Sequence, residues 1–560
     1  MIDALQGFDS IVNEAVKSWK TPGVGLAVVK DGEVIYSIGS GFRDKENQLP
    51  LTPDSIFAIG STSKAFTAAS IGILVDDGKL EWDKPIRNYI PEFRMYDPVA
   101  TENLSVRDML CHRSGLPRHE MVWYRRQISR RDLMKTLAYL EPNEGFRNRW
   151  QYQNIIYATT GLLVEAVTGK TWEEFVQERI LDPLGMTSTN FSVSVSEKSD
   201  DFCYPYLEKD GEVKRISFAN IDPIGPAGSI NSTLLDMCKW MAMNMNHGKA
   251  NGQQVISEGN LGQLHRPQMT IMEDNPMSSR ETDSYNDYGM GWVVYMYRGV
   301  PVLEHTGGID GFATEVMMVP GQQLGVVSFS NTMSGAPMAL ARIAIDRILG
   351  LEPIDWLKRY RESYEKAMST IKEMGKGPRK EGTKPTHPLK DFTGKFTHPG
   401  YGEIEFLLKD EALFLLFRGW EVALSHVHYN VFDGELPVLG IPFKFTFEMD
   451  DQGNIERVSS PFDVTVKPIV FTRVPDDAMK QRGFLEQFEG EYELMGQTLR
   501  IALKGEDALC ASGPGMPEME LVPYRGTTFT LKGMEVVSLE FKMNGGEKAA
   551  EVVMTQPGAV

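Results

Sequence analysis

Residues Phe57–Gly78 read FAIGSTSKAFTAASIGILVDDG, a short apolar run followed by an apolar helical pattern that ends at Gly78. Ser61 opens that helix, and Lys64 follows three residues later. A serine at a helix N-terminus lies among unbonded backbone N–H groups at the positive end of the helix dipole. A lysine one turn further on returns its amine to the same face. The spacing indicates a nucleophilic serine with a basic partner, or else an ordinary N-cap serine.

The S-x-x-K pattern alone is unspecific, because the chain also contains Ser363-x-x-Lys366 and Ser369-x-x-Lys372. Both of these lie inside a charged helical stretch, where the backbone N–H groups are already bonded. Only the copy at Ser61 follows an apolar strand-like run and a glycine. Context therefore favours Ser61 as the candidate nucleophile.

Two later segments offer polar groups to the same chemistry. Tyr152-Gln153-Asn154 directly precedes a helical pattern, and a phenol beside two cations would ionise more easily and act as a base. His305 lies in Glu304-His305-Thr306-Gly307-Gly308, where a strand would aim it at a cleft and the glycines would admit a substrate backbone. Each segment also has a structural interpretation: a half-buried tyrosine with a capping asparagine, and a hydrogen-bonded histidine.

Two hairpins bracket the first part of the chain. Residues 24–39 turn at Asp31-Gly32, and residues 315–330 turn at Pro320-Gly321. Helical patterns fill the sequence between them, so residues 1–350 are predicted to form an α+β domain with an antiparallel sheet.

The rest of the chain reads as a helix, a linker and two β modules. Residues 351–389 begin with a charged helix and end in a stretch rich in glycine, proline and lysine. Beyond them, FTGKF at 392–396 resembles FEGEY at 488–492, an offset of 96 residues. This offset predicts two small barrels, at 390–475 and 480–560, although coincidental turn chemistry would give a similar pattern.

The ordered elements near residues 61, 152 and 305 resemble those of the serine β-lactamase and penicillin-binding-protein superfamily. The resemblance is greatest to the branch that holds class C β-lactamases, family VIII esterases and D-aminopeptidases, and it covers about residues 5–350. The tandem modules resemble the lipocalin-like barrels of D-aminopeptidase. Supporting phrases are LCHRSGL at 110–116, LGM at 184–186 and AGS at 227–229.

The resemblance implies an acyl-enzyme mechanism without metal or cofactor. Ser61 would be the nucleophile, and Lys64 and Tyr152 would share the role of base. Tyr152 would also protonate the leaving group and activate water, while His305 would orient Tyr152 or the substrate. The backbone N–H groups of Ser61 and Gly308 would form the oxyanion hole. Asn154, Thr306 and Gly307 would contact the substrate.

One departure bears on the substrate. Many penicillin-recognising members carry lysine where this chain has His305, and a histidine is largely neutral at pH 7. Binding of a substrate carboxylate is therefore weakened. We expect a hydrolase of small amides or short peptides, D-amino-acid-containing as in D-aminopeptidases. The alternatives are a carboxylesterase on short acyl esters, a β-lactamase or D,D-peptidase, and a non-catalytic binding protein.

Composition and charge limit the classes of partner that this protein is expected to bind. The net charge is −18 over 560 residues, which would repel nucleic acid, and no apolar run is long enough to span a membrane. Four scattered cysteines suit neither a disulfide framework nor a zinc site, and His426-x-His428 has no third ligand nearby. The N-terminal stretch lacks the features of a signal peptide, so a cytoplasmic location is expected. The sequence does not decide the oligomeric state, and a homo-oligomer is one of the states that it allows.

One barrel loop offers a further contact with substrate. In the D-aminopeptidase arrangement, a barrel loop reaches the catalytic cleft and screens substrates. Residues 512–518 form a glycine- and proline-rich loop here, and Glu518 would meet a substrate amine. An exposed turn that touches nothing is the alternative.

Overall fold

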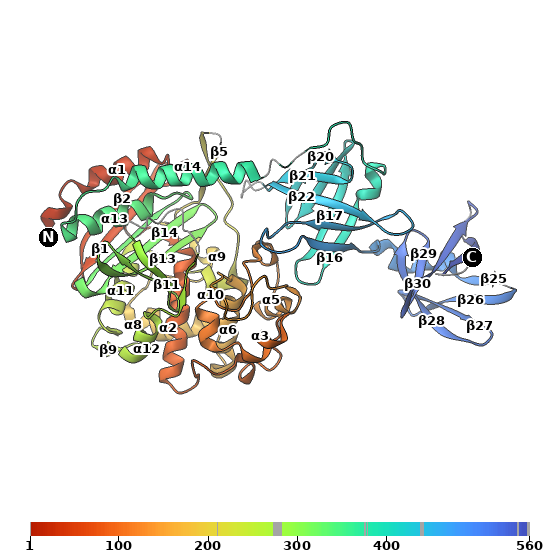
Figure 1. The fold of residues 1–560 in the computed structure, drawn as a ribbon, viewed down its shortest axis with the longest axis horizontal. Helices are drawn as coiled ribbons and strands as arrows, with labels where there is room; N and C mark the ends of the chain where they lie inside the picture. The colour runs from red at the N-terminus through yellow and green to blue at the C-terminus, as the bar shows by residue number, and fades with distance from the viewer. Residues whose placement is uncertain are drawn as a thin grey trace.

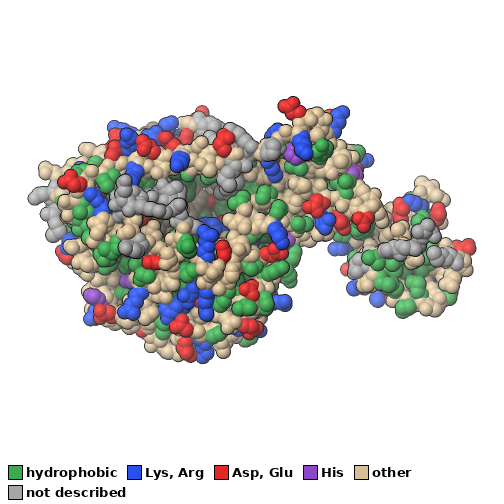
Figure 2. Space-filling model, viewed as in Figure 1, with side chains coloured by type: hydrophobic (Ala, Val, Ile, Leu, Met, Phe, Trp, Pro, Cys, Tyr) green, Lys and Arg blue, Asp and Glu red, His purple; other side chains and the backbone are tan. Residues whose placement is uncertain are grey.

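The computed structural model describes residues 2–209, 211–272, 283–374, 377, 379–436, 442–494, 496–545 and 548–556. A body of helices and sheet is followed by two all-β barrels, and the second barrel lies at the far end of the molecule from the body (Figure 1). Acidic and basic side chains are interspersed over the face drawn in Figure 2.

The body is organised around an antiparallel sheet to which both ends of the region contribute. Strand β1 pairs with β2 on one side and with β15 on the other, so the two predicted hairpins meet at the sheet centre. Their turns lie where the sequence indicated, at residues 31–32 and 320–323. The strand order is β10 (Met269–Thr270), β11 (Asp283–Tyr288), β12 (Val293–Tyr297), β13 (Val300–Ile309), β14 (Phe312–Val319), β15 (Leu324–Ser330), β1 (Gly23–Lys30), β2 (Glu33–Asp44) and β3 (Leu49–Pro50).

Three helices cover one face of this sheet. They are α1 (Phe8–Ser18), α13 (Ala336–Leu349) and α14 (Trp356–Met374), and they share a core with side chains of β1 and β15. Trp356 and Tyr360, four residues apart on α14, are 2% and 3% exposed. The apolar stripe of each helix therefore fixes which side packs on the sheet.

The other face carries the helical region. Helix α2 (Ser63–Asp76) is buried on all sides, because α6 (Asn154–Thr168), α10 (Gly225–Gly228) and α12 (Glu258–Leu264) pack around it. Helix α11 (Leu234–Met245) packs on β1 and β15 of the sheet, and its Trp240 stacks on Phe66 of α2. The remaining helices are α3 (Pro98–Asn103), α4 (Val106–Leu110), α5 (Arg130–Thr136), α7 (Trp172–Val176), α8 (Asp182–Leu184) and α9 (Val193–Ser196).

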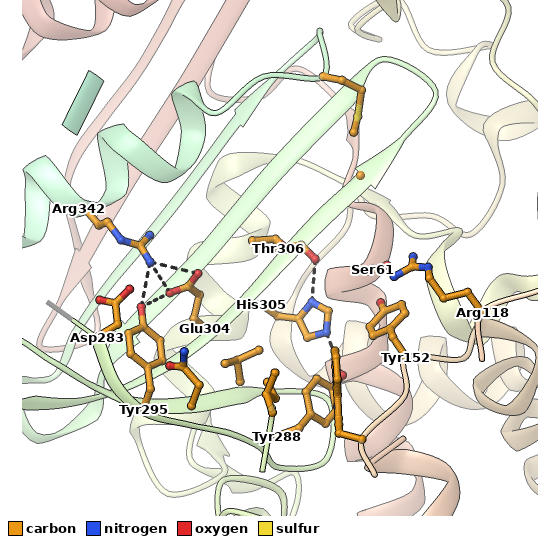
Figure 3. Close-up of a pocket in the computed structure, with 16 residues that line it drawn as sticks. Ser61, Arg118, Tyr152, Asp283, Tyr288, Tyr295, Glu304, His305, Thr306 and Arg342 are labelled. Carbon is orange, nitrogen blue, oxygen red and sulfur yellow. Dashed lines mark hydrogen bonds and ion pairs between the residues drawn. The ribbon is translucent and has the colours of Figure 1, made fainter. Parts of the chain in front are cut away.

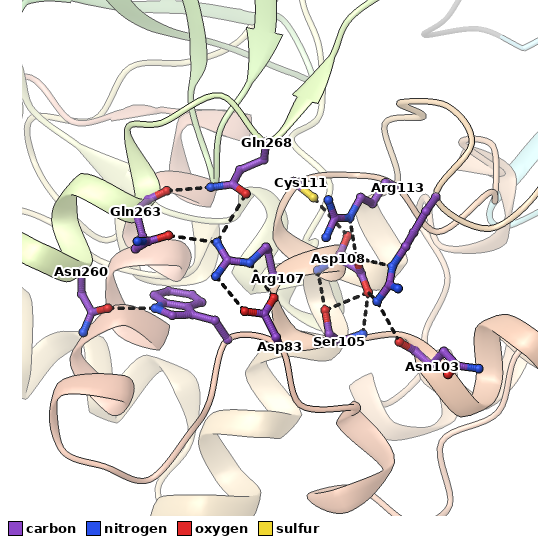
Figure 4. Close-up of polar contacts among 12 residues, drawn as sticks. Asp83, Asn103, Ser105, Arg107, Asp108, Cys111, Arg113, Asn260, Gln263 and Gln268 are labelled. Carbon is purple, nitrogen blue, oxygen red and sulfur yellow. Dashed lines mark hydrogen bonds and ion pairs between the residues drawn. The ribbon is translucent and has the colours of Figure 1, made fainter.

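A buried carboxylate fixes the segments that approach the sheet from this region (Figure 4). Asp108 is fully buried and accepts hydrogen bonds from the Ser105 backbone N–H and hydroxyl, both at 2.8 Å. Arg147 donates to it at 2.6 and 3.0 Å, and Arg113 also pairs with it. Asp108 thus joins the start of α4 to the segments that lead into Gly115 and Tyr152.

Two all-β barrels follow the body, with nine strands in the first and seven in the second among the residues that the structure describes. The predicted repeat pairs equivalent positions: Phe392 and Phe488 are fully buried before the first strand of each barrel, and Phe447 and Phe541 are buried in later strands. The first barrel contains β16 (Gly394–His398), β17 (Gly402–Lys409), β18 (Ala412–Phe417), β19 (Trp420–Ala423), β20 (Ser425–His428), β21 (Val431–Glu435), β22 (Pro442–Met449), β23 (Ile455–Ser460) and β24 (Ile469–Arg473). The second contains β25 (Gly490–Leu494), β26 (Gln497–Lys504), β27 (Ala508–Gly513), β28 (Met516–Arg525), β29 (Thr528–Leu531), β30 (Met534–Met543) and β31 (Ala549–Thr555).

The described residues can be compared with the requirements of a membrane span, a metal site and a disulfide. Within the described residues, no helix combines the length and apolar character needed to cross a bilayer. The same residues hold no cluster of three or more histidine, cysteine or acidic side chains arranged for a metal ion. All four cysteines are buried and unpaired by disulfides.

Asp108→Asn is expected to lower the free energy of unfolding by about 2–4 kcal/mol, because it removes the buried charge that two arginines share. Asp83→Asn is the matched control. Asp83 also pairs with an arginine, Arg107, but its side chain is 72% exposed, so the expected loss is about 0–1 kcal/mol. Urea unfolding of both variants measures the difference, and equal losses would contradict this assignment.

Candidate active site

Ser61 and Lys64 lie in direct contact at the start of α2. Ser61 belongs to the short 3₁₀ turn Gly60–Thr62 that leads into the helix, and its hydroxyl caps neither element. The Lys64 amine is fully buried, with Nζ 3.2 Å from Ser61 Oγ. The N-cap interpretation of Ser61 is therefore wrong, and its hydroxyl is directed at an amine.

The surroundings of Lys64 favour a neutral amine. Burial lowers the pKa of Lys64 well below its usual value and outweighs the opposing effect of Glu120. Nζ also lies 2.6 Å from the Ala227 carbonyl oxygen and 2.8 Å from Asn154 Oδ1. Both atoms can only accept, so a neutral amine gives them its two protons and keeps its lone pair for the Ser61 hydroxyl.

Asn154 fixes this arrangement through hydrogen bonds on both sides of its amide. Its Nδ2 donates to the Glu120 carboxylate at 3.0 Å, which leaves Oδ1 as the atom that meets Lys64. The side chain is buried at 6% exposure. The amide is engaged on both sides by Lys64 and Glu120, and the predicted substrate contact of Asn154 stays a prediction.

Tyr152 lies between two cationic side chains, but its pKa is not lowered as the sequence analysis expected of a phenol beside two cations. Lys64 Nζ and the Arg118 guanidinium carbon lie 4.6 and 4.7 Å from its ring centroid. Burial nevertheless raises the pKa of Tyr152 above its usual value, against the lowering effects of Ser61 and Arg118. The hydroxyl oxygen is buried without a well-formed hydrogen bond. Tyr152 is therefore suited to donate a proton rather than to act as a phenolate base.

His305 projects from β13 as a neutral imidazole. Its Nδ1 donates to the Thr306 carbonyl at 2.7 Å, so Nε2 is left to accept from the Tyr288 hydroxyl at 3.0 Å. Burial, helped by Lys64, lowers the pKa of His305 to about 3. The His305 and Tyr152 ring centroids are 6.4 Å apart, and the side chain that contacts His305 Nε2 is Tyr288, so the role of orienting Tyr152 or the substrate stays a prediction.

The glycines of β13 pass directly over the turn that carries Ser61. A Cβ on Gly307 would lie 2.0 Å from the Ile59 carbonyl oxygen and 3.4 Å from the Ser61 nitrogen. A Cβ on Gly60, whose φ is +53°, would lie 2.8 Å from the Gly308 nitrogen. This close approach brings the two predicted oxyanion donors, Ser61 and Gly308, to the same side of one cleft.

That cleft has a volume of about 530 Å³ and runs along β13 (Figure 3). One end holds Ser61, Arg118, Tyr152, His305, Thr306 and Gly308. At the other end Arg342, on α13, pairs with Glu304 at 3.1 Å, and Tyr295 also contacts this pair. The cleft thus joins a reactive group at one end to a charged cluster at the other, with the aromatic side chains of Trp150, Tyr288 and Tyr295 along it.

None of the described residues of the second barrel lines this cleft. The residues that line the cleft all come from the body, and the turn between β27 and β28 lies in the distant barrel (Figure 1). Glu518 instead pairs with Lys504 of its own barrel at 3.3 Å. The hypothesis that residues 512–518 enter the cleft is therefore wrong in this structure.

Sequence reasoning missed Arg118, Glu120 and Tyr288. Arg118 and Glu120 form an ion pair at 3.0 Å in the loop after LCHRSGL, and they reach the site through Tyr152 and Asn154. Charged loop residues have no periodicity that would single them out. The phrase AGS at 227–229 was noted, but nothing in it indicates that the Ala227 carbonyl holds a lysine.

Two family models match this chain, one over the body and one over the first barrel. The family model described as Beta-lactamase matches residues 8–350. A model described as a domain of unknown function, DUF3471, matches residues 378–473, the region of the first barrel. Unguisins hydrolase ungD' of Aspergillus campestris is 30% identical over 431 residues, which cover 72% of this chain and 78% of that protein.

Solved structures confirm the fold. The octameric penicillin-binding protein homologue from Pyrococcus abyssi matches 84% of this chain and all of its own, with a TM-score of 0.54 and 22% identity. The D-amino acid amidase from Ochrobactrum anthropi SV3 matches 62% of this chain and 98% of its own, with a TM-score of 0.51 and 22% identity. The predicted β-lactamase/transpeptidase-like domain followed by two all-β barrels is thereby confirmed.

His305→Gln is expected to flatten the acid side of the stability profile. Between pH 6.5 and about 3, the unfolded chain binds a proton at this histidine that the folded protein does not, so stability is lost as the pH falls. Removing the titration takes away a slope of about 1.4 kcal/mol per pH unit. Urea unfolding at several pH values measures it, with the exposed His247→Gln as control. An unchanged slope in His305→Gln would contradict the neutral assignment.

Proposed function

Because this chain belongs to the Beta-lactamase family, we propose that it is a serine hydrolase that cleaves small amides or short peptides through an acyl-enzyme. The contact between the buried Lys64 amine and Ser61 Oγ carries the proposal. Serine is a poor nucleophile until a base takes its proton, and a desolvated amine 3.2 Å away can do so.

In acylation, Lys64 Nζ takes the proton of Ser61, and Oγ attacks the substrate carbonyl carbon. The backbone N–H groups of Ser61 and Gly308 hold the negative charge that develops on the carbonyl oxygen. Tyr152 gives its proton to the leaving nitrogen as the C–N bond breaks, and the Lys64 ammonium returns a proton to the phenol. The raised pKa of Tyr152 suits this role, because the phenol is protonated when it is needed.

In deacylation, water attacks the acyl carbon from the side that the amine has left. Its proton passes to the neutral Lys64 amine, either directly or through the Tyr152 hydroxyl. The bond from Ser61 Oγ to the acyl carbon breaks, and Lys64 returns the proton to Oγ. The cycle releases a carboxylic acid and an amine, and it leaves every side chain in its starting protonation state.

The state of His305 bears on the choice among substrates. A β-lactamase or D,D-peptidase binds a substrate carboxylate. Many penicillin-recognising members carry a lysine for this purpose, and this chain has the neutral, buried imidazole of His305 at that position. This observation favours substrates without a free carboxylate near the scissile bond, such as amides and peptides that are cleaved at their N-terminus. We propose D-amino-acid amides as the first class to test, since the H-x-G element resembles that of D-aminopeptidases.

Ser61→Ala should abolish covalent labelling by a fluorophosphonate probe, because the probe reacts only with an activated serine hydroxyl. Ser363→Ala is the matched control, since Ser363-x-x-Lys366 has the same spacing but lies within α14. Labelling is read by mass spectrometry of the intact protein. Full labelling of Ser61→Ala would place the nucleophile elsewhere.

Tyr152→Phe should lower kcat/KM for D-alanine p-nitroanilide by about 10²–10⁴, because the leaving nitrogen loses its proton donor. A p-nitrophenyl ester of the same acyl group should lose much less, since its leaving group departs as an anion. The ratio of the two rates measures the role of the phenol. Equal losses on amide and ester would contradict proton donation and point to a positioning role.

A further inference from the structure

A second cavity adjoins the active-site cleft, at the junction of the body and the first barrel. Its volume is about 570 Å³, and it shares Arg118, Trp150 and Tyr152 with the cleft. The wall opposite these residues comes from the first barrel, through segments at residues 442–444 and 461–465. Its apolar lining consists of Pro117, Met121, Trp150, Ile371, Pro442, Phe443, Pro461, Phe462 and Val464.

The barrel wall is fixed to the body by buried polar contacts. Asp463 accepts a hydrogen bond from the His119 backbone N–H at 2.9 Å, between Arg118 and Glu120 of the active site. The His119 ring is 2.7 Å from the Tyr401 hydroxyl of the same barrel. Arg126 of the body donates to the Gly400 carbonyl of the barrel at 2.8 Å. The cavity is therefore preformed rather than assembled around a ligand.

The position of Tyr152 decides which part of a substrate would enter. Under the proposed mechanism, the Tyr152 hydroxyl donates to the leaving nitrogen, so the leaving group lies on the Tyr152 side of Ser61. The second cavity begins at this side chain, and Arg118, at the same boundary, has 57% of its side chain exposed. A leaving amine that carries a large side chain would thus extend past Tyr152 towards Phe443, Phe462 and Val464.

We propose that this cavity is the subsite for a bulky apolar group on the leaving amine, and that the first barrel determines this specificity through Val464. The assignment rests on the proposed serine hydrolase function. The cavity is large enough for an aromatic or branched aliphatic side chain, and burying such a group yields the main part of its binding free energy. The barrel is accordingly part of the substrate site.

Val464 allows a test that spares the fold. It is 71% exposed at the cavity, whereas Phe443 and Phe462 are buried among barrel aromatics and would destabilise the barrel if changed. Val464→Glu removes apolar surface and adds a charge at the rim. Val536→Glu is the matched control, because Val536 is 69% exposed in the second barrel, far from the cavity.

The kinetic experiment compares D-alanine phenethylamide with D-alanine methylamide, which differ only in the leaving amine. Wild-type protein should prefer the phenethylamide in kcat/KM, and Val464→Glu should reduce that preference by about tenfold. Val536→Glu should keep the wild-type preference. An unchanged preference in Val464→Glu, or an equal change in both variants, would overturn the inference.

A binding experiment separates this inference from the proposed function. Ser61→Ala protein should bind the neutral amide N-phenethylacetamide in calorimetry, and adding Val464→Glu should weaken the Kd at least fivefold, while adding Val536→Glu should not. If wild-type protein hydrolyses neither amide but binding depends on Val464, D-alanine amides are not its substrates, and the cavity stands as a binding site for an apolar group without its assignment to the leaving amine. If no binding is detected, or if binding is indifferent to Val464, the subsite is overturned.

Discussion

The buried amine of Lys64 is the constraint on which the rest of the site depends. Removed from water, it is poorer at holding a proton, and two fixed acceptors, the Ala227 carbonyl and Asn154 Oδ1, take up its N–H groups. The remaining lone pair is left for Ser61. The sheet places β13 against the turn at Gly60. The helical region surrounds α2, so the Lys64 amine is buried from solvent.

The loop from Arg118 to Glu120 connects this amine to the first barrel. Glu120 orients Asn154, and Arg118 covers the ring of Tyr152, while Asp463 of the barrel holds the backbone between them. Loops are the usual place for functional groups, and they need support from rigid elements to hold their geometry. The first barrel supplies that support here, whereas the second barrel lies beyond it (Figure 1), and none of its residues that the structure describes lines either cavity.

The sequence predicted the elements of the site better than their interactions. Ser61, Lys64, Tyr152 and His305 come together as the order of motifs indicated, and the repeat at Phe392 and Phe488 correctly predicted two barrels. The pKa of Tyr152 is raised, because burial, which a sequence motif does not show, outweighs the effect of the neighbouring cations. Arg118 and Glu120 were missed because no spacing connects a loop charge with a lysine 54 or more residues away. Which barrel meets the body depends on how the linker and α14 direct the chain, and a local pattern does not encode that direction.

The state of the amine can be measured directly. Selective labelling of lysine side chains with ¹³C and ¹⁵N, with Lys64 assigned by comparison with Lys64→Met, would give its titration curve by NMR. The account predicts a pKa well below the 10.5 of an ordinary lysine, because burial disfavours the charged form. A Lys64 that titrates at or above 10.5 would be an ammonium ion at the pH of catalysis, and it would contradict the role of general base on which the mechanism is built.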